Sequence, residues 1–119
     1  MRRGPGGGGL GDNPRMLLKV SLPDLHKELK SLLVAAREPG LVAQVDDLEI
    51  VDRCRCADDF CSSFYTAPKP AGAYGPKHRN VSLEPERGML ILDVVDERIV
   101  NVEVLYRDDI RSELMLLLP

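Results

Sequence analysis

The three cysteines of the chain, Cys54, Cys56 and Cys61, stand close together in a C-x-C-x4-C pattern. Cysteine sulfur is a preferred ligand of zinc, which binds four ligands in a tetrahedron with Zn–S distances of about 2.3 Å. If the residues between Cys56 and Cys61 close a β-hairpin, these two cysteines lie opposite each other, and Cys54 lies two positions back on the same face. The spacing therefore predicts that the three sulfurs converge.

Zinc needs a fourth ligand beside these three sulfurs, and the chain offers His78, Asp52 and Asp58 for that position. Our predicted metal set adds His78 to the three cysteines. The pattern differs from the paired C-x2-C signature of common zinc modules, so zinc is one interpretation among three. It is also the one cofactor that the sequence suggests.

Two other interpretations of the cysteines stay open. In the first, Cys54 and Cys56 extend the apolar face of Leu48 and Ile50 and act as small buried hydrophobes, a common state of free cysteine. In the second, Cys56 and Cys61 form a redox-active pair or a disulfide. Beyond the cysteines, the chain has only two histidines and no matched acid, base and nucleophile. The sequence therefore leans away from an enzyme.

A second candidate region is the segment 67–77, which contains three prolines and two glycines and predicts an extended loop. Ordered loops of this length are often functional, and a rigid loop presents its side chains at low entropic cost. Tyr74, Lys77, His78 and Arg79 are therefore candidates for a recognition edge. The alternative is that the segment is only a long connection.

The elements that position these residues begin with a helix. After Ser21, apolar residues recur at spacings of three and four, which is the pattern of one helix face. Ser21 can cap this helix, and Pro23 suits its first turn. The pair Pro39-Gly40 is expected to end it. We predict a helix over 22–37.

Alternating apolar and polar residues then predict strands. The first two strands are expected to form a hairpin, and the last three a meander joined by short turns. The predicted strands are 48–56, 61–66, 81–84, 89–95 and 99–105. A final apolar stripe predicts a helix that Asp108 or Asp109 caps and that lies across the sheet.

These elements predict an α+β protein, with an antiparallel meander sheet of about five strands and an N-terminal and a C-terminal helix packed on it. Residues 1–15 hold six of the ten glycines and predict a disordered tail. Residues 16–119 have the length of a single domain. Met16 opens the first apolar run and is a candidate start of translation.

Composition limits the classes of function and location. The chain has 119 residues, a net charge of −3, no Trp and only 4% aromatic residues, which argues against nucleic-acid binding. No run approaches the roughly 20 apolar residues of a membrane span, and the N-terminus lacks the apolar region of a secretory signal. We therefore expect a cytoplasmic protein that binds no nucleic acid and no membrane. Its expected partner is another protein or a second copy of itself.

The last predicted strands carry a recognisable pattern. An apolar strand ends in Leu92-Asp93, an acidic turn follows, and the next strand reads Ile-Val-Asn-Val-Glu-Val-Leu over residues 99–105. With this pattern, residues 80–106 resemble a family of small bacterial β-meander domains of unknown function. This chain has Asn101 where that family usually has a glycine. The resemblance implies a β-meander, but it assigns no activity and no site residue.

The sequence thus supports two hypotheses of function. The first is a non-enzymatic protein-interaction or accessory module, immunity-like in kind, because the chain offers a stable sheet and an acidic surface. The alternative is a zinc-binding or thiol-redox protein that uses Cys54, Cys56 and Cys61.

Overall fold

The structure is a computed structural model, and it describes residues 15–119. Its strands form one antiparallel sheet in the order β1-β2-β5-β4-β3. The strands are β1 (Asp52–Arg53), β2 (Phe64–Tyr65), β3 (His78–Leu83), β4 (Met89–Val95) and β5 (Arg98–Leu105). The helices are α1 (Leu18–Ser21), α2 (Pro23–Ala35), α3 (Pro39–Val45) and α4 (Asp108–Leu117). The predicted α+β fold with an antiparallel sheet is confirmed. The predicted tail, apart from Arg15, lies outside the described residues.

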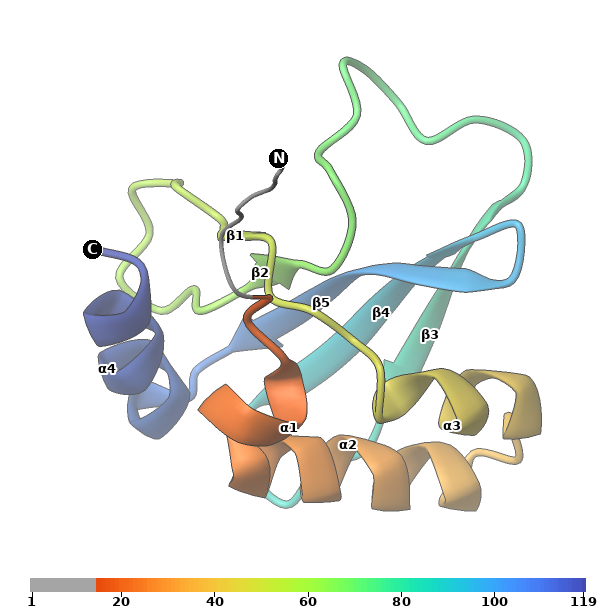
Figure 1. Cartoon of the computed structure of the whole chain (residues 1–119), viewed down its shortest axis with the longest axis horizontal. Coiled ribbons are helices and arrows are strands. Elements are labelled where there is room, and N and C mark those ends of the chain that lie inside the picture. The colour runs from red at the N-terminus through yellow and green to blue at the C-terminus, as the bar shows by residue number, and fades with distance from the viewer. Residues whose placement is uncertain (1–14) are drawn as a thin grey trace, which may run out of the picture.

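The helices and the sheet form two layers. Figure 1 shows α1, α2 and α3 together on one side of the sheet, with the loop between β2 and β3 on the other side. Leu90, Leu92 and Val94 alternate along β4 and are fully buried, as are Leu29 and Leu33 of α2. The buried side chains that alternate along β4 therefore pack against the apolar face of α2, and the core lies between these two layers.

The sheet combines a meander with a separate hairpin. Strands β3, β4 and β5 follow one another as predicted. Strand β2 pairs with β5, with Phe64 opposite Val102, so the loop after β2 carries the chain across to the far edge at β3. The β1–β2 hairpin therefore extends the sheet beyond β5, on the side of β5 that does not pair with β4.

The helical region is more divided than the sequence predicts. Helix α2 agrees closely with the predicted helix at 22–37. Pro39, which we expected to end that helix, instead opens α3, because a proline in the first turn lacks only an N–H that would have no helical partner. Ser21 belongs to α1, and no side chain caps α2.

The first predicted hairpin is shorter than expected. Most of the predicted strands 48–56 and 61–66 is irregular, and only the two-residue strands β1 and β2 form a ladder. Leu48 and Ile50 are nevertheless buried, as their alternation predicts. At the far edge, β3 begins at His78, so part of the expected recognition edge is strand.

Helix α4 forms where the last apolar stripe predicts it, with Ile110 and Leu114 buried. Asp108 and Asp109 lie in its first turn, where their negative charge favours the helix dipole, but neither side chain caps the helix. Figure 1 shows α4 at one end of the sheet instead of across it. It follows directly after β5 and therefore packs beside the hairpin end of the molecule.

Candidate metal centre

The three cysteine side chains converge, as their spacing predicts. Their sulfur atoms all lie within 4.8 Å of one another. The register of the hairpin explains this, because Arg53 pairs with Phe64, and the same register continued toward the tip places Cys56 opposite Cys61. The backbone N–H of Cys54 donates to the Ser63 carbonyl at 2.8 Å, which anchors the first cysteine beside the ladder.

The cysteines are free thiols in unequal environments. Cys54 and Cys61 are half-buried, whereas Cys56 is exposed. The exposure of Cys56 contradicts the interpretation that it continues the buried face of Leu48 and Ile50. That face ends because the strand is irregular after Arg53.

The pKa values of two of these thiols move in opposite directions. Burial raises the pKa of Cys54 to about 11. The pKa of Cys56 is lowered, first by the backbone N–H of Asp58 and then by the neighbouring thiols of Cys54 and Cys61. Cys56 is therefore expected to deprotonate before Cys54.

The structure does not bring His78 to the cysteines. His78 lies on β3, at the opposite edge of the sheet from β1, and its Nε2 hydrogen-bonds the Asp93 carboxylate at 2.7 Å. Asp52 is also engaged, because its carboxylate accepts from Arg55 at 2.9 Å. Among the described His, Cys, Asp and Glu side chains, the converging group holds the three sulfurs alone. A metal ion there would keep its fourth position for a ligand from outside this group.

A cavity of about 340 Å³ lies beside the sulfurs and carries positive charge. Cys54 and Cys56 line it together with Arg53, Arg55 and Lys69. The two arginines also donate to main-chain oxygens of the last residues of the chain. Because cations outnumber acidic groups at its wall, the cavity favours an anionic ligand.

The other residues of the expected recognition edge form contacts with neighbouring residues of the same chain. The ring centroids of Tyr74 and His78 lie 4.9 Å apart. Lys77 forms an exposed ion pair with Asp96. Arg79 donates to Glu38 and to Glu97, and so joins β3 to the α2–α3 connection and to the β4–β5 turn. The side chains of this edge therefore connect parts of the same chain to one another.

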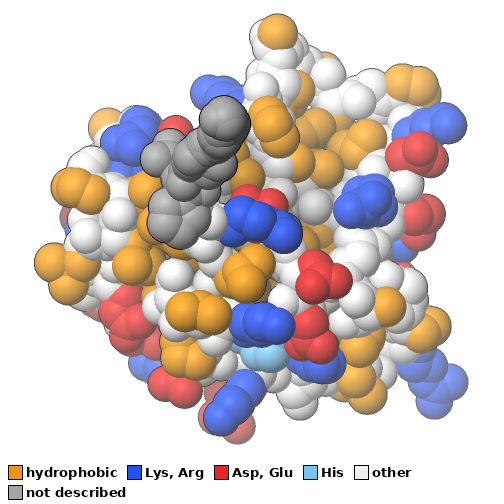
Figure 2. Space-filling model, viewed as in Figure 1, with side chains coloured by type: hydrophobic (Ala, Val, Ile, Leu, Met, Phe, Trp, Pro, Cys, Tyr) orange, Lys and Arg blue, Asp and Glu red, His pale blue; other side chains and the backbone are white. Residues whose placement is uncertain are grey.

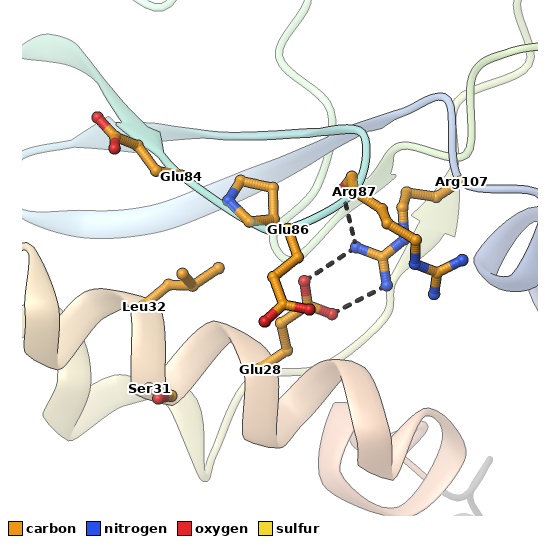
Figure 3. Close-up of a pocket in the computed structure, with 8 residues that line it drawn as sticks. Glu28, Ser31, Leu32, Glu84, Glu86, Arg87 and Arg107 are labelled. Carbon is orange, nitrogen blue, oxygen red and sulfur yellow. Dashed lines mark hydrogen bonds and ion pairs between the residues drawn. The ribbon is translucent and has the colours of Figure 1, made fainter.

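A larger cavity, of about 440 Å³, lies between α2 and the β3–β4 turn (Figure 3). Arg107 is only 5% exposed there and donates to both carboxylate oxygens of Glu28 at 2.9 Å. It also donates to Asp109 and to the carbonyl of Arg87. Because Arg107 is fully engaged in linking α2 to the turn and to α4, we interpret this cavity as structural.

Comparisons with known proteins return no relationship: no family model, no curated protein and no solved structure matches the chain. The resemblance of residues 80–106 to bacterial β-meander domains therefore stays a prediction. Among the described residues, none of the helices combines the length and the apolar character that a membrane crossing requires.

Proposed function

We propose that the protein binds zinc through the thiolates of Cys54, Cys56 and Cys61. The observation that supports this is the convergence of the three sulfurs within 4.8 Å. A tetrahedral zinc ion with Zn–S bonds of about 2.3 Å holds its sulfurs roughly 3.8 Å apart. Three thiols at this separation need only a small inward shift to share one ion.

The environments of the three thiols and the adjacent cavity are compatible with the proposed ion. The thiolate of Cys56 is available before that of Cys54, and metal binding releases the thiol protons that remain. The fourth position is free for an external ligand. The cationic cavity beside Cys54 and Cys56 favours an anion there, such as a carboxylate, phosphate or thiolate group.

Cobalt substitution tests the metal site. Titration of the reduced chain with Co²⁺ is expected to saturate at one equivalent and to produce thiolate-to-metal charge-transfer absorption. Zn²⁺ should then displace the cobalt. Each of Cys54→Ser, Cys56→Ser and Cys61→Ser is expected to weaken metal binding by roughly tenfold or more, about 1.4 kcal/mol.

His78→Gln is the matched control for these variants, because His78 lies across the sheet and is not expected to be a ligand. Equal loss of cobalt binding in this variant would contradict the three-sulfur site. Absence of charge-transfer absorption, together with ready formation of a Cys56–Cys61 disulfide under mild oxidation, would replace the zinc proposal with the thiol-redox alternative.

A non-enzymatic interaction role is the second candidate, and the exposed apolar side chains near α4 favour it. Leu116 is 84% and Tyr106 is 62% exposed, and Tyr106 stacks on Phe60 with ring centroids 5.1 Å apart. Figure 2 shows hydrophobic side chains projecting from the end of the molecule where Figure 1 places α4. Exposed apolar side chains of this kind can bind a protein partner or a second copy of the chain. We place this interaction in the cytoplasm, where a reducing environment keeps cysteines as thiols. The measurement that tests this role is the oligomeric state of the full chain.

A further inference from the structure

Strand β3 forms one edge of the sheet and pairs with β4 alone. In an antiparallel pair, every second residue exchanges its backbone hydrogen bonds with the partner strand. The N–H of Asp96 donates to the Lys77 carbonyl, so the odd-numbered residues of β3 are the ones that bond to β4. The backbone N–H and C=O groups of Asn80 and Ser82 therefore point away from β4, as the unpaired groups of an edge strand.

These outward groups are open to a further strand. Asn80 and Ser82 are exposed, whereas Val81 and Leu83 are buried on the face that packs against the helices. Within residues 15–119, no other backbone group hydrogen-bonds to Asn80 or Ser82 from the free side. An extended peptide could therefore pair with these two residues and lengthen the sheet by one strand.

A hollow of about 370 Å³ lies beside this edge, between β3 and the C-terminal half of α2. We call it the edge groove. Its walls are formed by Leu32, Ala35, Ala36, Ser82, Leu83 and Glu84. The two alanines are small and leave room beside Leu83 for a side chain from outside. Because side chains alternate along a strand, an added strand would direct every second side chain toward α2 and into this groove.

Unpaired negative charge lies at the end of β3. Figure 3 shows the Glu84 side chain pointing away from α2 and the Glu86 side chain extending from the β3–β4 turn toward α2. Arg87 and Arg107, which line the adjacent larger cavity, form ion pairs with other carboxylates. Among the described residues, the charges of Glu84 and Glu86 are therefore left without an ion-pair partner, and this end of the edge attracts a cation.

The opposite end of β3 carries positive residues that are already paired. Lys77 forms an ion pair with Asp96, and Arg79 forms ion pairs with two glutamates. An antiparallel second copy of β3 would bring only these engaged cations toward Glu84. The edge therefore favours a strand from another protein that carries its own free positive charge.

We propose that an extended segment of a partner protein adds to β3 as an antiparallel strand, with a basic residue opposite Glu84 followed by an apolar residue in the edge groove. In an antiparallel pair, the residue opposite Glu84 directly precedes the residue opposite Leu83. Directly opposite residues share one face of a sheet, so the basic side chain lies beside Glu84 and the apolar one faces α2. Backbone bonds to Asn80 and Ser82 supply affinity, and the basic and apolar side chains supply specificity.

Backbone-amide NMR of the full reduced chain tests the proposal with the capped pentapeptide Lys-Leu-Thr-Val-Thr. Its lysine is placed opposite Glu84 and its first threonine opposite Ser82. We expect saturable shifts of the Asn80 and Ser82 amides, together with slower hydrogen exchange at both. Replacement of the lysine by glutamate is expected to weaken binding about fivefold or more, because it brings a like charge to Glu84.

Two N-methylated peptides separate strand addition from simple attraction of charge. The N–H of the first threonine is directed at the Ser82 carbonyl, whereas the leucine N–H points away from β3. Methylation of that threonine nitrogen should therefore weaken binding about tenfold or more. Methylation of the leucine nitrogen is the matched control and should change the affinity by less than about twofold.

Variants of the chain test the same contacts from the other side. Ser82→Pro removes an outward N–H, a change that edge strands tolerate, and is expected to weaken binding about tenfold. Glu84→Gln is expected to weaken it about threefold, whereas Glu113→Gln, the same change at an exposed site on α4, should leave it unchanged. Thermal unfolding shows whether each variant is folded, and the N-methylated peptides test the proposal if Ser82→Pro is not.

Three results would overturn the proposal. The first is equal affinity of the two N-methylated peptides, and the second is a set of amide shifts that excludes Asn80 and Ser82. The third is a shift of these two amides with protein concentration alone, which would assign the edge to a second copy of the chain. The zinc proposal would survive any of these, because the edge groove shares no residue with the three cysteines.

Discussion

At the residue scale, the cysteines illustrate how position along one short segment controls chemistry. Cys54 and Cys56 are two residues apart, yet the pKa of the first is raised and that of the second is lowered. The difference arises because Cys54 lies against the sheet, where burial disfavours its charge. Cys56 lies at the exposed tip, where the backbone N–H of Asp58 and the neighbouring thiols lower its pKa. Nucleophilic reactivity is therefore expected at Cys56 before Cys54.

This inequality predicts the pH dependence of alkylation. Since the thiolate is the reactive form, Cys56 should react with iodoacetamide first, and its rate should rise at a lower pH than that of an unperturbed thiol. Cys54, with a pKa of about 11, should stay protonated and slow near neutral pH. Mass-spectrometric mapping after short exposures at several pH values measures both.

The double variant Cys54→Ser/Cys61→Ser is the control for alkylation, because it replaces the two thiols that lower the pKa of Cys56. Its profile should move toward that of an ordinary cysteine, although the serine hydroxyls retain part of the effect. Alkylation of Cys54 ahead of Cys56 would contradict the assignment.

At the element scale, the end of α2 shows a helix stop that uses no glycine. The N–H of Arg37 donates to the Val34 carbonyl and the N–H of Glu38 donates to the Leu33 carbonyl, both at 3.1 Å, which is the hydrogen-bond pattern of a Schellman motif. Arg37 has φ 60°, in the left-handed region that normally favours glycine. The pattern of contacts therefore holds an arginine in an unfavourable conformation.

Arg37→Gly is expected to raise the free energy of unfolding by about 1 kcal/mol, because glycine adopts a positive φ without steric cost. The Arg37 side chain is exposed, so its loss removes little. Arg37→Ala is the control, since it removes the same side chain but keeps the strain. Urea denaturation of the three proteins measures the difference, and equal stabilities of the glycine and alanine variants would disprove it.

At the scale of the whole molecule, the exposed apolar side chains are not all equivalent. Val34 is 62% exposed on α2, and Leu116 is 84% exposed on α4. Near α4, the stacked pair of Phe60 and Tyr106 adds exposed aromatic surface. The α4 end is therefore the stronger candidate for contact with another chain.

Light scattering of the full chain tests self-association through this end. At high protein concentration we expect the mass of a dimer for the unmodified chain, and the mass of a monomer for Leu116→Ser. Val34→Ser is the matched control and should remain dimeric, because Val34 lies away from α4. A monomeric unmodified chain would contradict self-association, and a dimeric Leu116→Ser variant would place the contact elsewhere.

The amino-acid sequence alone predicted part of the local structure, but it missed α1 and α3 and made the strands of the first hairpin too long. Apolar periodicity predicts α2, α4 and the β3–β5 meander, because burial on one face imposes a period of two on strands and three to four on helices. It also predicts that the sulfurs of Cys54, Cys56 and Cys61 converge, since a hairpin register depends on residues near in the chain. Proline was ambiguous at Pro39, because the same residue that cannot continue one helix can begin the next.

Only the tertiary structure decided which distant residues meet. It placed His78 beside Asp93 instead of the cysteines, because the order β1-β2-β5-β4-β3 puts the two strands at opposite edges. It also gathered Asn101 and Asp93 on one face, although each reads in the sequence as a polar interruption of an apolar strand. Strand order and cross-strand register depend on long-range packing, so they cannot be predicted from a local pattern of residues.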